Sequence, residues 1–199
     1  MARQEAGKVW TNKVRLSYAR IWEPDENGRY SCTLLVPKTD KQTIQALKQA
    51  ETYMRSQAKD FFKGKVPSDL KVPLHDGDKP MPQGGEWGEA AKGHIVVRAS
   101  SRTKPGIVDL QRQEITDSLE VYSGCYARVT INFFLYDNKD AGAKGMSIGL
   151  GNIQKVADGE ALGGRARAED DFAESEDWMS GSEDGLGDSD DLDDLLGSA

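Results

Sequence analysis

Aromatic rings and a cation alternate along one face of the most regular strand pattern in the sequence, residues 125–136. The other face of this strand is apolar throughout, which predicts that it packs into a core. Tyr126, Arg128 and Tyr136 lie on the outward face, and such residues can hold single-stranded nucleic acid, because rings stack under bases while cations follow the phosphates. Phe134 shares this face, but we expect it to be the one ring there that joins the core. The alternative is that the helix or a second copy in a homodimer covers the whole face.

Further rings and cations outside this strand extend the candidate site. Trp87 is the best stacking candidate among the remaining rings, ahead of Trp10 and Trp22, because it lies in a segment rich in Gly and Pro. Its alternative role is a plug on the mouth of a barrel, and each cation taken singly could be an ordinary surface charge. The predicted DNA-contacting set is Lys13, Arg15, Trp87, Arg98, Arg102, Lys104, Tyr122, Tyr126, Arg128 and Tyr136.

The charge of the chain is divided between two segments. Residues 1–157 carry 24 Lys and Arg against 18 Asp and Glu, a net charge of +6, whereas residues 158–199 carry 2 against 15, a net charge of −13. A basic body attracts polyanions, and an attached polyanion competes for the same surface. This division predicts a folded domain at 1–157 and an acidic tail at 158–199.

Residue patterns that serve catalysis or metal binding are weak. We find no Ser-His-Asp, Cys-His or paired-carboxylate arrangement, and Asp109 and Glu114 alone do not make a nuclease site. His75 and His94 lack Cys or His at zinc spacing, and the segment 75–78 is typical of a turn. The sequence therefore predicts a binding protein without enzymatic activity, metal or cofactor.

The predicted elements are mostly strands. Period-two alternation indicates strands at 9–18, 30–36, 94–99, 107–110, 125–136 and 146–156, with a bend or bulge at the glycines 149 and 151. Val14, Leu16 and Tyr18 form the apolar face of the first strand. Thr39 and Gln42 match a capping box that opens a helix over about 40–62, and 63–92 reads as a long loop. Five or more strands with one helix favour a small twisted barrel.

The cysteines and the tail complete this picture. Cys32 and Cys125 lie inside strand patterns, so we expect two buried free thiols rather than a disulfide. The tail has too few large apolar residues to offset its ordering entropy and is predicted to be disordered. Its last acidic and leucine-bearing stretch could fold against a partner protein. That predicted partner segment is Asp191, Leu192, Asp193, Asp194, Leu195 and Leu196.

Three blocks of the sequence resemble the signature blocks of a family of tailed-phage single-stranded DNA-binding proteins. They are YSCTLLVPKTD at 30–40, VYSGCYARVTIN at 121–132 and GMSIGLGNIQKV at 145–156. The resemblance implies a five-stranded OB-fold barrel that coats single-stranded DNA during phage replication and recombination, with an acidic C-terminal tail. One difference is that this chain ends in LLGSA, so leucines rather than a terminal aromatic residue would anchor a partner.

Two other classes of function stay open at this point. The body could be a scaffold for a tail that mimics DNA or docks on a basic partner, or the chain could process DNA as a nuclease. The N-terminus has no apolar leader and no window is apolar enough for a membrane span, which predicts a cytoplasmic protein, in the host cell if it is a phage protein.

Overall fold

Strands dominate the computed structural model, which describes residues 1–67, 70, 72–138 and 143–163. One long helix, α1 (Lys41–Phe61), follows the fourth strand, and a short 3-10 helix, η1 (Glu89–Ala91), precedes the sixth. The mainly β class with one main helix is therefore confirmed. The strands are β1 (Arg3–Glu5), β2 (Lys8–Trp10), β3 (Val14–Arg20), β4 (Tyr30–Pro37), β5 (Leu74–Asp76), β6 (His94–Ser101), β7 (Ile107–Val108), β8 (Tyr126–Asn138) and β9 (Ala143–Ala157).

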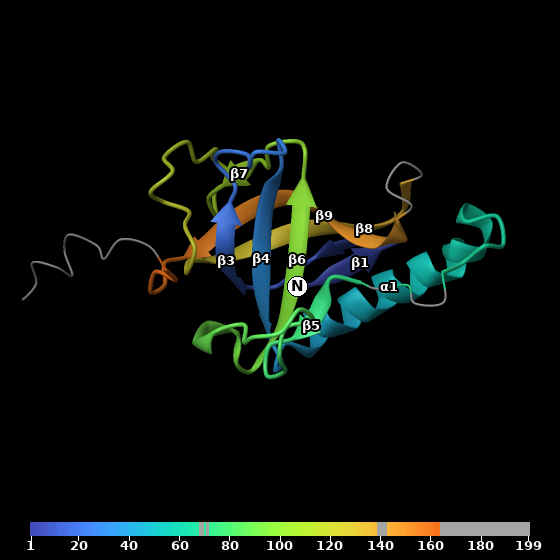
Figure 1. Cartoon of the computed structure of the whole chain (residues 1–199). Helices are drawn as coiled ribbons and strands as arrows, with labels where there is room; N and C mark the ends of the chain where they lie inside the picture. Colours follow the sequence, from blue (N-terminus) through green and yellow to red (C-terminus); the bar gives the residue numbers. More distant parts are fainter. Residues whose placement is uncertain (68–69, 71, 139–142, 164–199) are drawn as a thin grey trace, which may run out of the picture. The chain divides into compact units, whose positions relative to one another are not determined.

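Five of the strands close into a ring. The hydrogen-bonded order is β8, β3, β4, β6 and β9, and β9 returns to pair with β8 along most of its length. All of these pairings are antiparallel except that of β6 with β9, where Ser100 pairs with Gly149 in parallel. Figure 1 shows β3, β4 and β6 side by side, crossing β8 and β9. This five-stranded arrangement is that of an OB-fold.

The predicted first strand, 9–18, is in fact two strands. β2 pairs with β8 through Val9 and Ile131, and β3 pairs with the same strand through Val14 and Ala127. Between them the Thr11 hydroxyl accepts a hydrogen bond of 2.9 Å from the Val129 amide, so a side chain replaces a ladder contact and interrupts the strand. The prediction of a continuous strand was wrong for this reason, and it also missed the short edge strand β1.

The core lies inside the ring, where the alternation of β8 predicted it. Ala127, Val129, Ile131 and Phe133 are all at most 1% exposed. Facing residues of the other ring strands complete the cluster, including Leu16, Leu34, Val97 and Ile148. Cys32 and Cys125 are buried in the same core as free thiols, which confirms that expectation.

Helix α1 packs one face against the ring and against the inner side of β1 and β2. Its N-cap is Asp40, whose carboxylate accepts from the Thr43 amide at 3.1 Å, so the predicted capping box from Thr39 was one residue early. Leu47 and Ala58 of the helix are buried, but Phe61 at its end is 48% exposed. The helix ends there, and Phe62 turns inward instead at 3% exposure.

Strand β9 contains the predicted irregularity. Val129 pairs with Ile153, whereas Ile131 pairs with Leu150, so β9 carries one extra residue at this point. A Cβ at Gly151 would collide with the Thr130 side chain and would lie 2.8 Å from the Thr130 carbonyl oxygen. Glycine is therefore required by the close approach of β8, and the bulge bends the strand around the ring.

The described part of the long loop 63–92 is mostly irregular, with β5 and η1 as its two short elements. Asp76 and Asp78 in this loop pair with Lys38, so the 75–78 cluster is a turn held by an ion pair. Within the described ranges no group of three metal-binding side chains occurs. Nor does any helix in those ranges have the length and apolar character needed to cross a bilayer.

Candidate nucleic-acid interface

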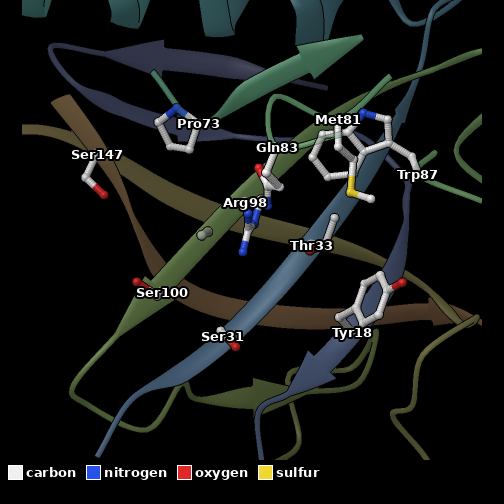
Figure 2. A pocket seen from close by; sticks show the side chains of 11 residues that line it. Tyr18, Ser31, Thr33, Pro73, Met81, Gln83, Trp87, Arg98, Ser100 and Ser147 are labelled. Atoms are coloured by element: carbon white, nitrogen blue, oxygen red, sulfur yellow. The ribbon is translucent and has the colours of Figure 1, made fainter. Parts of the chain in front are cut away.

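A shallow hollow of about 430 Å³ lies on the outer surface of β3, β4, β6 and β9. Strand alternation builds its floor from small polar side chains, because the neighbouring residues on each strand point into the core. Figure 2 shows Arg98 projecting from β6 into the middle of the hollow, with Trp87 and Tyr18 on one side and Ser147 on the other. The floor residues are Ser31, Thr33, Ser100 and Ser147.

Tyr18 reaches this hollow because β3 is distorted. The register between β3 and β4 shifts between Ser17 and Arg20, and Tyr18 has a φ of 46° in the left-handed region. That bulge turns the ring outward, where it is 74% exposed. The sequence placed Tyr18 on the apolar face with Leu16, and this was wrong because simple alternation does not anticipate a bulge. A strained, exposed ring beside a hollow is a feature of binding sites.

The loop that carries Trp87 is fixed to the ring at its base. Lys38 Nζ lies 2.6 Å from Asp78 Oδ2, and Asp78 Oδ1 accepts from the Gly93 amide at 2.7 Å. These contacts hold the pKa of the Asp78 carboxyl below its ordinary value, chiefly through the hydrogen bond from Lys38. The loop then folds back over the hollow through a turn in which the Met81 amide donates to the Gly85 carbonyl at 2.9 Å.

Trp87 is half-buried and stacks on His75, with ring centroids 5.0 Å apart and planes at 28°. Burial lowers the pKa of His75, and the positive charge of Arg98 lowers it further, so the imidazole under Trp87 is neutral at pH 7. The Trp87 indole N–H is buried without an acceptor among the described residues. The ring is thus held by stacking and packing rather than by its polar atom.

A second hollow, of about 620 Å³, continues the first along the β8–β9 hairpin. The two share Pro73, Gln83 and Ser147 in their linings, and we call the combined surface the outer groove. Phe134 and Tyr136 line this second part and are 39% and 37% exposed. The expectation that Phe134 belongs to the core was wrong, because the hairpin extends beyond the residues that could cover it.

The electrostatics of the outer groove are one-sided. Arg98 and Arg29 line it, and no Asp or Glu does so among the residues that the structure describes. The Arg98 side chain forms no hydrogen bond or ion pair with any described residue, whereas the Arg29 guanidinium donates one long hydrogen bond of 3.4 Å to the Ser100 hydroxyl. Both guanidinium groups therefore retain donors for an anionic ligand.

The predicted contact residues fall into separate places. Trp87, Arg98 and Tyr136 lie in the outer groove. Arg102 and Lys104 lie in the loop between β6 and β7, where the Lys104 ammonium is 5.5 Å from the Trp22 ring. Lys13, Arg15, Tyr122 and Tyr126 gather on another side of the ring, and Arg128 lies near the N-terminus with its guanidinium 3.4 Å from the Met1 carbonyl oxygen.

The cluster around Tyr126 is already engaged with the chain segment that follows β9. Arg15 donates to the carbonyl oxygens of Gly124 at 3.1 Å and Glu160 at 2.8 Å. The Tyr122 hydroxyl donates to the Gly159 carbonyl at 2.8 Å. The predicted partner segment, Asp191, Leu192, Asp193, Asp194, Leu195 and Leu196, lies outside the described residues.

The groove also contains residues that sequence reasoning missed, among them Tyr18, Arg29, His75, Met81 and Phe134. Phe134 was visible as an outward residue and was misassigned. Arg29 directly follows the pair Asn27–Gly28, which is typical of a tight turn, and this signal would have placed Arg29 at a loop end beside the barrel. Tyr18, His75 and Met81 carried no such signal, because a bulge and an irregular loop position them.

Comparison with known proteins agrees with this geometry. The family model described as the ssDNA-binding protein of Enterobacter phage Enc34 matches residues 7–184. The chain belongs to this family. The Enc34-type family is one of binding proteins, which confirms the predictions of a phage single-stranded DNA-binding relationship and of a protein that is not an enzyme.

Individual proteins similar to this chain include two solved structures and one phage sequence. The structure of the single-stranded DNA-binding protein from bacteriophage Enc34 in complex with ssDNA has a TM-score of 0.64 and 27% identity, covering 80% of this chain and 91% of that one. Putative protein p50 of Acyrthosiphon pisum secondary endosymbiont phage 1 is 27% identical over 169 residues, 79% of this chain and 87% of its own length. The gp2.5 single-stranded DNA-binding protein of bacteriophage T7, at 16% identity and a TM-score of 0.56, shares the fold, covering 92% of this chain and 98% of that one.

Proposed function

We propose that this protein binds single-stranded DNA in the outer groove, as a non-catalytic coat. The observation that carries the proposal is the lining of the groove: exposed rings of Tyr18, Phe134 and Tyr136, the half-buried ring of Trp87, and the unpaired cation of Arg98, with no described carboxylate. Rings that stack under bases and cations that contact phosphates are the two components of such sites. Each stacked base contributes about 1–3 kcal/mol.

The floor of the groove accounts for low sequence preference. Ser31, Thr33, Ser100 and Ser147 are short and present hydroxyls that both donate and accept. Such a floor lets bases approach but provides no fixed donor and acceptor pattern of the kind that distinguishes one base from another. In this proposal the protein covers and protects single-stranded DNA during phage replication and recombination, in the host cytoplasm.

The acidic tail is proposed to modulate this binding and to contact replication or recombination proteins through residues 191–196. Its net charge of −13 at 158–199 makes it a competitor for the groove. The composition of residues 164–199 predicts a flexible chain, and a flexible chain of about 36 residues has a root-mean-square span of roughly 33 Å, which is enough to reach across a domain of this size. The last described residues support this idea, because Leu162 packs beside Leu35 and Ala91 in a cluster that includes Trp87 of the groove.

A titration of fluorescent single- and double-stranded oligonucleotides, at two salt concentrations, tests the proposal. Phe134→Ala and Arg98→Gln should weaken binding to single strands, while Tyr53→Ala, a matched exposed ring on α1, should not. Removal of the tail should tighten binding mainly at low salt, since the competition is electrostatic. The cut belongs after Gly163, because a cut after 157 would also remove the contacts of Arg15 and Tyr122.

The same titration separates the competing classes of function. An oligonucleotide affinity that is unchanged by both groove variants and by tail removal would contradict the proposal. It would favour an interaction module that acts through its tail. Magnesium-dependent loss of the oligonucleotide would favour a nuclease.

A further inference from the structure

An aromatic side chain and two cations form a second surface outside the outer groove, on β1 and β2. The Arg3 guanidinium carbon is 4.1 Å from the centroid of the Trp10 ring, and the Lys8 ammonium is 4.8 Å from it. Arg3 and Trp10 are direct partners in the β1–β2 ladder, so the three side chains share one face of the sheet. We call this surface, together with Arg128, the N-terminal patch.

The patch faces away from the core. Val9, between Lys8 and Trp10, is fully buried and pairs with Ile131, so its two neighbours point outward beside Asn132 and Thr130 of β8. Helix α1 covers the opposite, inner side, where Gly7 approaches Met54. The outer side is therefore left open by the helix.

The charge of the N-terminal patch is positive. Arg3, Lys8 and Arg128 contribute three cations, and Glu5, which pairs with Lys8 across the ladder, is the one carboxylate on β1 and β2. Neither Arg3 nor Lys8 forms an ion pair with a residue that the structure describes, and both contact the Trp10 ring instead. Cation–ring contacts at exposed positions are weak, so both cations are available to a stronger anionic partner.

The patch continues the outer groove along β8. Lys8 lies opposite Asn132, and Phe134, which lines the groove, is the next outward residue on the same strand. Alternate residues on a strand are about 7 Å apart. A DNA strand that leaves the groove past Phe134 in the direction of Asn132 thus meets Lys8 first, then Trp10 and Arg3.

We propose that the N-terminal patch binds the single-stranded DNA segment that leaves the groove past Phe134, so that Trp10 stacks on a base while Lys8 and Arg3 contact the flanking phosphates. Charge-assisted hydrogen bonds to phosphate are stronger than the ring contacts that the two cations give up. The inference rests on the proposed function and extends it, because it makes the bound segment longer than the groove alone. Continuity with Phe134 favours DNA over the acidic tail of a second copy.

The test compares a short oligonucleotide of about 5 nucleotides with one of about 16, the two ends of the usual site sizes of OB-folds. The full-length protein is used, with Trp10→Ala and with the double variant Arg3→Gln/Lys8→Gln. Trp10→Ala should weaken binding of the long oligonucleotide by about 5- to 150-fold, the contribution of one stacked base, and leave the short one unchanged. The double variant should reduce the slope of log affinity against log salt concentration by about 1.4, or about 0.7 for each lost phosphate contact, and only for the long oligonucleotide.

Matched controls separate local contact from general electrostatics. Lys41→Gln/Lys48→Gln removes the same charge from exposed positions on α1 and should leave the long-oligonucleotide slope closer to that of the unmodified protein. If Trp10→Ala does not fold, Trp10→Phe keeps a ring and should retain affinity, with a smaller DNA-induced change in tryptophan fluorescence than the unmodified protein.

Each outcome has a separate meaning. Long-oligonucleotide binding that the patch variants leave unchanged would overturn the inference, as would an equal loss at both lengths or an equal effect of the α1 control. The inference would also be overturned if the patch variants bound DNA normally but bound a peptide of residues 158–199 more weakly than the unmodified protein does. Failure of the unmodified protein to bind either oligonucleotide would instead overturn the proposed function.

Discussion

Replacing Tyr18 by glycine should separate DNA binding from stability more cleanly than any other change in the groove. Tyr18 holds a φ of 46°, and a left-handed conformation costs an L-residue about 1–2 kcal/mol. Glycine adopts this conformation freely but loses roughly 0.5–1 kcal/mol more backbone entropy on folding. The ring is 74% exposed, so little packing is lost. The free energy of unfolding should therefore stay the same or rise by about 1 kcal/mol.

The affinity for single-stranded DNA should fall in the same variant. If the Tyr18 ring stacks on one base, its loss removes about 1–3 kcal/mol, which is about a 5- to 150-fold increase in Kd. Tyr18→Phe keeps the ring and should bind like the unmodified protein. Tyr53→Ala removes a ring that is 41% exposed on α1 and serves as the control for nonspecific loss of an aromatic residue.

Fluorescence anisotropy with a labelled oligo(dT) measures the affinity, and urea denaturation measures the stability. Unchanged DNA affinity in Tyr18→Gly, with the fold intact, would remove Tyr18 from the interface. A large loss of stability would refute the strain argument, because it would mean that the ring packs more than its exposure indicates.

Three further predictions concern the five-stranded ring, its core and the loop 63–92. Gly151→Ala should destabilise the protein by about 1–3 kcal/mol, seen as a lower Tm, because the added methyl meets the Thr130 carbonyl oxygen at 2.8 Å. Gly149→Ala in the same strand is the comparison and should cost less, because its methyl would lie 3.5 Å from the nearest atom, the Asn132 carbonyl oxygen. Cys32 should resist a thiol reagent until the protein unfolds, since burial raises its pKa to about 12, and labelling as fast as in a denatured sample would contradict this. Hydrogen bonds from Lys38 lower the pKa of Asp76 and Asp78, so the stabilising contribution of these carboxylates is present above about pH 4 and is lost as the pH falls through their lowered pKa values. Lys38→Met should therefore flatten the acid side of a curve of Tm against pH. An unchanged curve would show that the ion pair does not stabilise the loop.

The parts of the fold that sequence could predict are those that follow from simple repetition. The strict alternation of β8 identified its buried residues Val129, Ile131 and Phe133, and glycine at 151 identified the bulge in β9. The bulge that exposes Tyr18 could not be found in this way, because it has no glycine and its residue types fit a regular strand. The helix cap was misplaced by one residue because Thr39 and Asp40 are both good caps and only the structure selects between them.

The sequence indicated which types of residue form the candidate site better than it indicated where the fold places each of them. Residue type identifies which side chains could contact DNA, but not which of them the fold has already engaged. Arg15 and Arg98 look equivalent in the sequence, each a cation on a strand with polar neighbours. In the structure the Arg15 side chain donates to the carbonyl oxygens of Gly124 and Glu160, whereas the Arg98 side chain has no hydrogen-bond or ion-pair partner among the described residues and projects into an open hollow.

This difference gives a physical rule for sorting the predicted cations. A guanidinium with its donors satisfied must break those hydrogen bonds before it can bind phosphate, so it contributes less to affinity than one whose donors are free. Arg15 and Tyr122 therefore hold the segment after β9 against the ring, whereas the Arg98 guanidinium keeps its donors free for the DNA that we propose to bind in the groove. If DNA binding displaces the acidic tail, the tail should detach from the ring beyond these contacts, starting at Leu162, which packs in the cluster that includes Trp87. The competing segment therefore begins at the rim of the groove that it would occupy.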